Sequence, residues 1–160
     1  MDSCRASPAD TQQALAQAET LCQQRGVRLT DLRRRVLEII WSSTAPLGAY
    51  AILDVLREDG RQGASAPPTV YRALDFLLEQ GLIHRLVSLN VFTVCHQPGK
   101  PHNGQFLICQ DCGHVNEMNN PEIDHLLRTE TEGRGFETRT RIVEILGRCP
   151  ECLEESTRYA

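Results

Sequence analysis

The sequence predicts an α+β protein with an N-terminal winged-helix domain and a small C-terminal α/β domain. Three observations lead to this fold class. Four segments between residues 11 and 80 repeat apolar residues at helical spacing. A short strand pair is predicted directly after them, and helices followed by a strand pair are typical of a winged helix. Beyond a Pro- and Gly-containing linker at residues 97–104, predicted strands alternate with a helix. The predicted domains are therefore residues 1–96 and 105–160.

Composition restricts the class of protein. The chain has 160 residues, and none of its apolar runs approaches the roughly 20 residues of a membrane span. It also shows no basic segment followed by an apolar secretion signal. Seven cysteines without such a signal indicate a reducing compartment and metal binding instead of disulfides. We therefore expect a cytoplasmic protein without a membrane partner, in which Cys4 and Cys22 have no role.

The formal net charge of −4 is unevenly distributed. Residues 1–90 hold 10 arginines and 10 acidic residues, whereas residues 91–160 hold 7 basic and 11 acidic residues. The second half therefore carries the whole excess. The first half contains a local basic cluster against only Asp31: Arg25, Arg28, Arg33, Arg34 and Arg35. A solvated helix face is the ordinary explanation of such a cluster, and a surface that binds DNA phosphates is the more specific one.

The first two helices are bounded by clear start and stop signals. Residues 1–9 are predicted to be disordered, and the first helix covers residues 11–25 and ends at Gly26. Thr30 is a suitable N-cap for the second helix, which is predicted to run to about Ser42. The residues expected to face the core are Leu15, Ala18, Leu21, Leu32, Val36, Ile39 and Ile40.

The third and fourth helices are separated by a Gly-, Ser- and Pro-rich loop. The third follows Pro46, and the fourth begins at Pro67 or Pro68 and ends before Gly81. Their expected core residues are Ala49, Ile52, Leu53, Leu56, Val70, Leu74, Leu77 and Leu78.

The outward positions of the fourth helix suit a DNA recognition helix. They are Thr69, Tyr71, Arg72 and Asp75, close to the start of the helix. An arginine can bond bidentately to guanine, a tyrosine can reach a phosphate or a thymine methyl, and a helix N-terminus favours phosphate. Polar residues on a helix surface are common without such a function, so DNA contact is a hypothesis at this point.

The C-terminal domain is predicted from shorter signals. Strands are expected at residues 105–108 and 115–118, and Asn120 caps a helix that ends at Gly133 and Gly135. Ile123, Leu126 and Leu127 are expected to form its buried face. A long strand is predicted over residues 136–146. Because so small a sheet leaves a face to cover, we expect a second copy of the chain to cover it and to form a two-fold dimer.

Two C-x-x-C pairs predict a structural metal site. Cys109 and Cys112 form one pair, and Cys149 and Cys152 form the other. Four thiolates at about 2.3 Å make a closed tetrahedral zinc site with no open position for chemistry. Gly113 supports the interpretation, since the residue after the second cysteine often needs positive φ. The alternatives are reduced cysteines, a disulfide or a redox-active pair.

A second metal set is predicted from His84, Cys95, His102 and Glu117. If Leu89 and Asn90 form a two-residue hairpin tip, His84 lies directly opposite Cys95, close enough to share one ion. The four ligands come from separate segments, so a metal bound to all four would link those segments. Exposed histidines and an unpaired thiol are common without a metal, and they are the ordinary explanation of this set.

An enzyme is the alternative interpretation of a His/Cys/Glu zinc centre. Such a centre activates water when one coordination position stays open, with Glu117 as a base instead of a ligand. Zinc deaminases carry an H-x-E motif before the second cysteine pair, and this chain contains no H-x-E. We therefore predict no catalytic residues and no small-molecule substrate. A zinc-ribbon interaction module is a third interpretation, but it leaves the four N-terminal helices unexplained.

The order of these features resembles the ferric uptake regulator family of metal-sensing repressors. The resemblance covers about residues 12–153 and is strongest in RLTDLRRRVLEII, in PPTVYRALDFLLEQGLIH, and in CxxCG followed by the distal CxxC. It implies an N-terminal winged-helix DNA-binding domain and a C-terminal α/β dimerisation domain. It also implies a metal-loaded homodimer that binds double-stranded, pseudo-palindromic operator DNA and represses transcription.

The resemblance further implies roles for individual residues. The four C-x-x-C cysteines match the family's structural zinc site, and the second set matches its sensing site, so two zinc ions per chain are expected. Tyr71 and Arg72 match recognition-helix contacts, and Tyr50 matches a further DNA contact. The candidate DNA-binding residues are Tyr50, Thr69, Tyr71, Arg72, Arg28, Arg34 and Arg35.

One departure from the family pattern bears on the choice of metal. The HHxH segment typical of iron sensors is reduced here to PHNGQF, and a thiolate stays in the sensing set. One thiolate, two imidazoles and one carboxylate favour tetrahedral zinc over iron(II) or manganese. We therefore expect repression of zinc-uptake genes, with an iron, manganese or peroxide sensor as the alternative. A His-rich segment after Cys152 is absent, and no third metal site is predicted.

Overall fold

The computed structural model describes residues 8–60, 66–100 and 102–158. The chain divides into two compact units, residues 1–99 and 100–160, and this boundary falls inside the predicted linker at residues 97–104. Most of the predicted disordered start, residues 1–9, and with it Cys4, lies outside the described residues. None of the described helices is long and apolar enough to cross a membrane.

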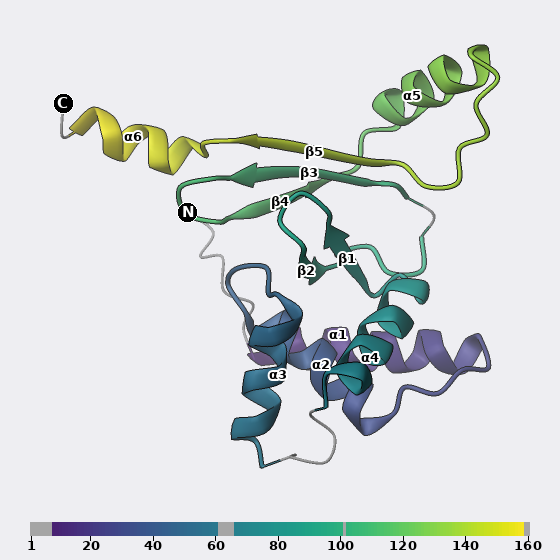
Figure 1. Ribbon diagram of the computed structural model, residues 1–160, viewed down its shortest axis with the longest axis vertical. Helices are drawn as coiled ribbons and strands as arrows, with labels where there is room; N and C mark the ends of the chain where they lie inside the picture. The colour runs from purple at the N-terminus through teal and green to yellow at the C-terminus, as the bar shows by residue number, and fades with distance from the viewer. Residues whose placement is uncertain (1–7, 61–65, 101, 159–160) are drawn as a thin grey trace. The chain divides into compact units, whose positions relative to one another are not determined.

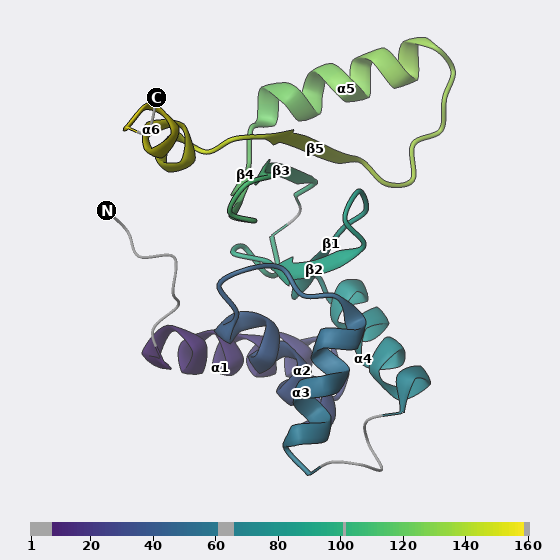
Figure 2. The ribbon, with the colours of Figure 1, turned by 60° about the vertical axis from the view of Figure 1, so that its left-hand side comes forward.

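The first unit has the predicted order of helices followed by a strand pair (Figures 1 and 2). Its elements in chain order are α1 (Pro8–Gln24), α2 (Asp31–Ser42), α3 (Ala49–Glu58), α4 (Pro67–Glu79), β1 (Ile83–Leu86) and β2 (Val91–Val94). The first helix starts three residues before the predicted position, whereas the second ends at the predicted Ser42.

Local signals explain why these helices begin and end where they do. Thr30 caps α2, and its hydroxyl oxygen accepts a hydrogen bond from the backbone N–H of Arg33 at 3.5 Å. Gly26 adopts φ +68°, which lets the chain leave α1 in a left-handed turn that other residues rarely adopt. Proline at the start of α4 fits because the first helical N–H groups have no partner within the helix.

The core of the first unit is formed by one side of each helix. The residues predicted from helical spacing are buried or half-buried, and Phe92 of β2 joins the same cluster. Burial of one aliphatic side chain contributes about 1.5–3 kcal/mol, so this cluster is the main source of stability for the unit. The polar sides of α3 and α4 consequently face solvent.

The strand pair differs in register from the prediction. Leu86 pairs with Val91 and His84 pairs with Thr93, so a four-residue turn replaces the predicted two-residue tip. The prediction that His84 lies directly opposite Cys95 was therefore wrong. The backbone N–H of Cys95 donates to the carbonyl of Leu82 at 3.2 Å, which continues the pairing one step beyond the strand. His84 and Cys95 are diagonal neighbours on the same face of the hairpin, because directly paired positions share a face.

The second unit is a three-stranded sheet with two helices (Figure 1). Its elements are β3 (Gly104–Cys109), β4 (Val115–Met118), α5 (Pro121–Gly133), β5 (Ile142–Gly147) and α6 (Pro150–Arg158). The strand order is β4-β3-β5, with β4 antiparallel and β5 parallel to β3. Helix α6 was not predicted from the sequence.

For the second unit, one prediction was wrong and another holds only in part. The strand expected over residues 136–146 is only Ile142–Gly147. Its partner β3 begins at Gly104, which pairs with Ile142, so the residues before Ile142 have no partner in β3. The expected buried face of α5 is covered only in part: Ile123 and Leu127 are half-buried, whereas Leu126 is 60% exposed. Asn120 does cap this helix, and its side-chain oxygen accepts from the backbone N–H of Glu122 at 2.9 Å.

Candidate metal centres

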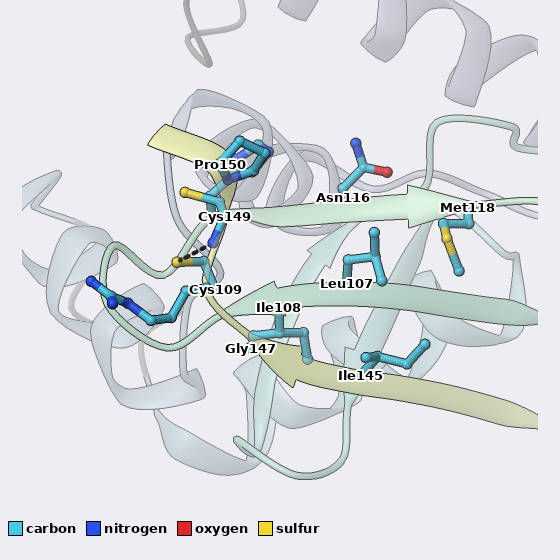
Figure 3. Close-up of a pocket in the computed structure, with 11 residues that line it drawn as sticks. Leu107, Ile108, Cys109, Asn116, Met118, Ile145, Gly147, Cys149 and Pro150 are labelled. Carbon is cyan, nitrogen blue, oxygen red and sulfur yellow. Dashed lines mark hydrogen bonds between the residues drawn. The ribbon is translucent and has the colours of Figure 1, made fainter. Parts of the chain in front are cut away.

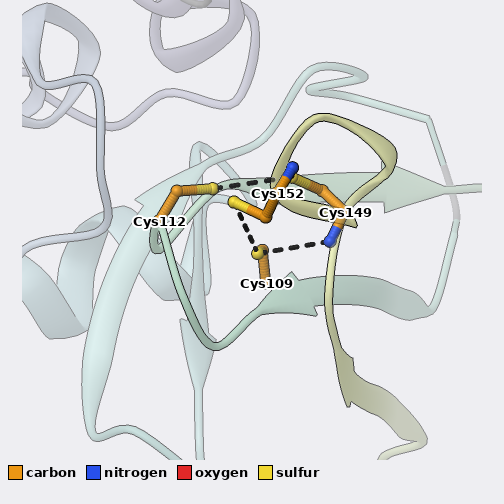
Figure 4. Close-up of side chains that lie close together, drawn as sticks. All are labelled: Cys109, Cys112, Cys149 and Cys152. Atoms are coloured by element: carbon orange, nitrogen blue, oxygen red, sulfur yellow. Dashed lines mark hydrogen bonds between the residues drawn. The ribbon is translucent and has the colours of Figure 1, made fainter. Parts of the chain in front are cut away.

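The four C-x-x-C cysteines form one cluster in the second unit (Figure 4). Their sulfur atoms all lie within 4.8 Å of one another. The Cys109 and Cys152 sulfurs are 3.9 Å apart, and the Cys112 and Cys149 sulfurs are 3.7 Å apart. Sulfurs at the corners of a tetrahedron with metal–sulfur bonds of about 2.3 Å are about 3.8 Å apart. The cluster therefore has the dimensions of a Cys4 zinc site.

The ends of two parallel strands bring the cysteine pairs together. Cys109 is the last residue of β3 and pairs with Gly147, the last residue of β5. The chain therefore leaves both strands at the same end of the sheet. The first pair folds into a tight turn in which the Cys109 N–H donates to the His114 carbonyl at 2.8 Å. Gly113 completes this turn with φ +74°, as predicted.

Hydrogen bonds prepare the thiols unequally for metal binding. Backbone N–H groups of Cys112 and Cys149 stabilise the thiolate of Cys109 and lower its pKa to about 6. Hydrogen bonding with Cys149 raises the pKa of Cys152 well above its ordinary value. A metal ion that binds all four sulfurs would consequently displace thiol protons at neutral pH.

Arg148 and Asp111 form a contact across this cluster that the sequence analysis missed. Arg148 Nε donates to the Asp111 carboxylate at 2.5 Å, and a second guanidinium nitrogen donates to the Cys152 carbonyl at 3.1 Å. Asp111 lies inside the first cysteine pair and Arg148 directly precedes the second. The ion pair therefore joins the two metal-binding turns. An oppositely charged residue beside each pair was the available signal.

The second predicted set has two ligands in each unit. In the first unit, His84 is half-buried on β1, and Cys95 is buried after β2. In the second unit, His102 Nε2 lies 3.0 Å from Glu117 Oε1, and the two side chains are only 6% and 8% exposed. The other ring nitrogen of His102 lies 2.8 Å from the Lys100 carbonyl oxygen. Such a second contact orients a histidine toward a metal through its remaining nitrogen.

Comparison with known proteins assigns the chain to a family. Residues 24–146 match the ferric uptake regulator family. The chain belongs to this family. It is 43% identical over 151 residues to the zinc uptake regulation protein of Escherichia coli strain K12, an alignment that covers 93% of this chain and 87% of the relative.

Solved structures of members of the ferric uptake regulator family agree with this assignment. A zinc uptake regulator complexed with zinc and DNA superposes with a TM-score of 0.87 and 42% identity, covering 92% of this chain and 97% of that one. The holo form of XcZur superposes with a TM-score of 0.81 and 38% identity, covering 88% and 96%. These similarities support the α+β fold class with a winged helix and a dimerisation domain.

The predicted DNA-binding residues of this family member occupy different environments. Tyr50 at the start of α3 is 68% exposed, Tyr71 on α4 is 43% exposed, and Arg72 is exposed beside it. Thr69, also on α4, is half-buried, and Arg28 is exposed just before α2. These residues stay candidates for DNA contact.

Two of the predicted phosphate-binding arginines already have partners in the first unit. Arg34 pairs with Glu19 at 3.1 Å. Arg35 binds both carboxylate oxygens of Asp59, at 2.7 and 3.0 Å, and also pairs with Glu38. The hydrogen bonds to Asp59 and Glu38 raise the pKa of the Arg35 guanidinium. Arg35 therefore connects α2 to the end of α3, a structural role that the sequence analysis did not predict.

An apolar hollow of about 460 Å³ lies on the sheet of the second unit beside the cysteine cluster (Figure 3). Leu107 of β3, Met118 of β4 and Ile145 of β5 line it. Leu107 is 41% exposed and Ile145 is 47% exposed. Exposed apolar surface of this extent on a small sheet is typical of an interaction face.

Proposed function

We propose that this protein is a zinc-sensing transcriptional repressor that, as a zinc-loaded homodimer, binds pseudo-palindromic operator DNA and represses zinc-uptake genes. The observation that carries the proposal is the similarity to zinc uptake regulators over most of the chain. The Cys4 cluster, which has the dimensions of a zinc site, supports a structural zinc ion beside the regulatory one. A soft donor set of this kind favours zinc among the divalent metals available to the family.

The structural zinc ion would be held by Cys109, Cys112, Cys149 and Cys152. Sulfur separations of 3.7 and 3.9 Å support this assignment, because they leave room for one tetrahedral ion and no open coordination position. Two strand ends of the second unit would then be cross-linked beside Arg148 and Asp111. This ion contributes to folding and not to sensing.

The regulatory zinc ion would be held by His84, Cys95, His102 and Glu117. The short His102–Glu117 contact and the shared hairpin face of His84 and Cys95 support the proposal within each unit. One thiolate and one carboxylate balance the charge of a divalent ion, which reduces the cost of binding it in a half-buried site. Two of the ligands belong to each unit, so a metal ion bound to all four would restrict the relative positions of the units that the linker allows.

The DNA surface would be centred on α4. Arg72 would read base edges, and Tyr71 and Thr69 would contact the backbone or a thymine methyl, with Tyr50 on α3 and Arg28 before α2 as further contacts. Exposure of Tyr50, Tyr71 and Arg72 supports this part of the proposal. Arg34 and Arg35 would contribute mainly through the local positive potential, because carboxylates already bind their guanidinium groups.

The dimer would be formed by the second unit. Helix α5 has no fully buried residue, and the sheet exposes Leu107 and Ile145. Both the helix and the sheet therefore present apolar side chains that a single chain leaves uncovered. A second copy that covers both would pair two recognition helices for adjacent major grooves. Exposed apolar side chains of this kind are typical of the centre of a homodimer interface.

Metal specificity of DNA binding tests the proposal. The readily removed metal is first stripped by mild chelation, and binding to a labelled pseudo-palindromic promoter fragment is followed by fluorescence anisotropy. Zinc at low free concentration should restore binding, whereas iron(II) and manganese(II) should need far higher concentrations. Restoration by iron or manganese at lower free concentration than zinc would make the protein an iron or manganese sensor of the same family.

A further inference from the structure

A buried glutamine on β3 binds the residue that caps α5, and both lie close in sequence to two of the proposed regulatory ligands, His102 and Glu117. Gln105 on β3 is only 1% exposed. Its side-chain oxygen accepts from the backbone N–H of Asn120 at 3.2 Å, and its side-chain nitrogen donates to the Asn120 carbonyl at 3.0 Å. A buried amide with both its donor and its acceptor bound has a fixed orientation. Gln105 therefore fixes the residue that caps α5 to the second position of β3.

The same network continues into the first turns of α5. The Asp124 carboxylate accepts from the side-chain nitrogen of Asn103 at 2.7 Å and from that of Gln105 at 3.4 Å. Asn103 directly follows His102, so its hydrogen bond begins one residue from a proposed zinc ligand. Three side chains and one backbone unit thus link the start of β3 to α5.

The network lies between two functional features of the second unit. On one side are His102 and Glu117, which are in contact with each other at 3.0 Å and which precede Asn103 and Asn120 by one and three residues. On the other side is α5, which buries none of its residues in its own unit. Between Glu117 and α5 there are only three residues, and Gln105 binds the last of them at both backbone groups.

We propose that Gln105, with Asn103 and Asp124, is a positioning network that couples occupancy of the regulatory zinc site to the placement of helix α5. A metal ion bound to His102 and Glu117 would fix the start of β3 and the end of β4. The hydrogen bonds of Gln105 would then also limit the movement of Asn120 and Asp124. This inference rests on the proposed function, because it assumes zinc at His102 and Glu117 and a dimer face that includes α5. Zinc and α5 order should then stabilise one another reciprocally.

The substitution Gln105→Leu tests the network, since leucine is close in volume to glutamine but lacks its donor and acceptor. The protein is used as the full chain loaded with structural zinc. Competition with a zinc chelator measures the affinity of the exchangeable zinc, and hydrogen exchange measures protection of the α5 amides with and without that zinc. In the unsubstituted protein, zinc should slow exchange in α5 by about tenfold, the lower part of the usual range of coupling.

Gln105→Leu should lower the affinity for exchangeable zinc by about tenfold, as removal of groups that support metal ligands commonly does. It should also reduce the effect of zinc on α5 exchange to less than about twofold. A residue with a merely structural role would change the exchange of α5 equally with and without zinc. Gln17→Leu is the matched control, because it makes the same change of side chain at an exposed glutamine of α1 in the first unit.

Unchanged zinc affinity and unchanged zinc-dependent protection of α5 in Gln105→Leu would overturn the proposal, as would a loss of affinity without any change in α5. If Gln105→Leu does not retain structural zinc, Asn103→Ala replaces it, and the same two results are required of that variant. Failure of the proposed function gives a different result: the unsubstituted protein would then bind no exchangeable zinc. Exchangeable zinc without any effect on α5 would remove only the coupling.

Discussion

The sulfur atoms of Cys109 and Cys152 lie 3.9 Å apart, although the two residues are 43 positions apart in the chain. Cys109 ends β3 and Cys152 belongs to α6, and the pairing of β3 with β5 brings the two residues together. A metal ion between the two cysteine pairs would close the second unit at this end of its sheet. Metal binding there would therefore be linked to folding.

Loss of one cysteine ligand should weaken the whole second unit. In Cys109→Ser, the non-exchangeable zinc should be lost, and the free energy of unfolding should fall by about 3 kcal/mol or more, because structural zinc contributes folding energy. Native mass spectrometry and thermal unfolding measure the two effects. Cys22→Ala is the control: Cys22 is a buried cysteine of the first unit, and its loss should leave zinc content unchanged. Full zinc content in Cys109→Ser would rule out the Cys4 assignment.

Zinc affinity of the cysteine cluster should fall as pH falls. Protons compete with metal for thiolates, and the pKa of Cys152 is raised by its hydrogen bond with Cys149, so zinc displaces at least this proton at neutral pH. Chelator competition between pH 8 and 6 should show a loss of affinity of at least about tenfold per pH unit, because each displaced thiol proton contributes one factor of ten. The dependence should steepen below about 6, where Cys109 also binds a proton. An affinity that does not change over this range would contradict the thiolate ligand set.

Arg35 should matter for stability and Arg72 for DNA binding. Arg35→Gln removes a two-bond contact with Asp59 in which both side chains are less than a third exposed, and should cost about 1 kcal/mol of unfolding free energy. Arg72→Gln, at an exposed position on α4, should leave stability unchanged and relax base preference by about 1–3 kcal/mol. Urea unfolding and anisotropy with altered operator sequences separate the two effects. The reverse outcome would assign Arg35 to the DNA surface.

Leu126 should contribute to the dimer and not to the fold of the single chain. It is 60% exposed on α5, so Leu126→Glu costs little burial within its own unit but introduces a charge into the proposed interface. Analytical ultracentrifugation should show at least about a tenfold weaker dimer. Leu89→Glu is the matched control, because Leu89 is 45% exposed in the turn between β1 and β2 of the first unit. Equal effects of both substitutions would remove α5 from the interface.

Much of the first unit could be predicted from the sequence because its signals are local. Thr30, Gly26 and the prolines at the start of α4 bound the helices where capping rules expect them, and helical spacing identifies most of the core. The register of the hairpin was predicted wrongly because the length of its turn was wrong. Residues 87–90 form a four-residue connection, and Asn90 has the positive φ within it. Spacing of apolar residues alone does not distinguish two-residue from four-residue turns.

The second unit was harder to predict because its stability depends on partners distant in sequence. The length of β5 is set by β3, which lies more than 30 residues earlier, and the face of α5 expected to be buried is only half-buried in a single chain, with Leu126 exposed. The cysteine spacing nevertheless identified a cluster whose sulfurs come within 4.8 Å. The contact of Gln105 with Asn120 follows from strand pairing and leaves no motif in the sequence, whereas the opposite charges of Asp111 and Arg148 at the cysteine pairs were an available signal.

Zinc stoichiometry combined with DNA binding tests the central claim most directly. Native mass spectrometry counts zinc per chain while anisotropy follows operator binding across buffered free zinc, for the unsubstituted protein and for His84→Ala and Cys95→Ser. The account predicts two zinc ions per chain, one of them exchangeable, and DNA binding that appears as the exchangeable site fills. Both variants should retain one zinc ion and the fold but lose zinc-dependent DNA binding. Full zinc-dependent DNA binding by either folded variant would contradict the account.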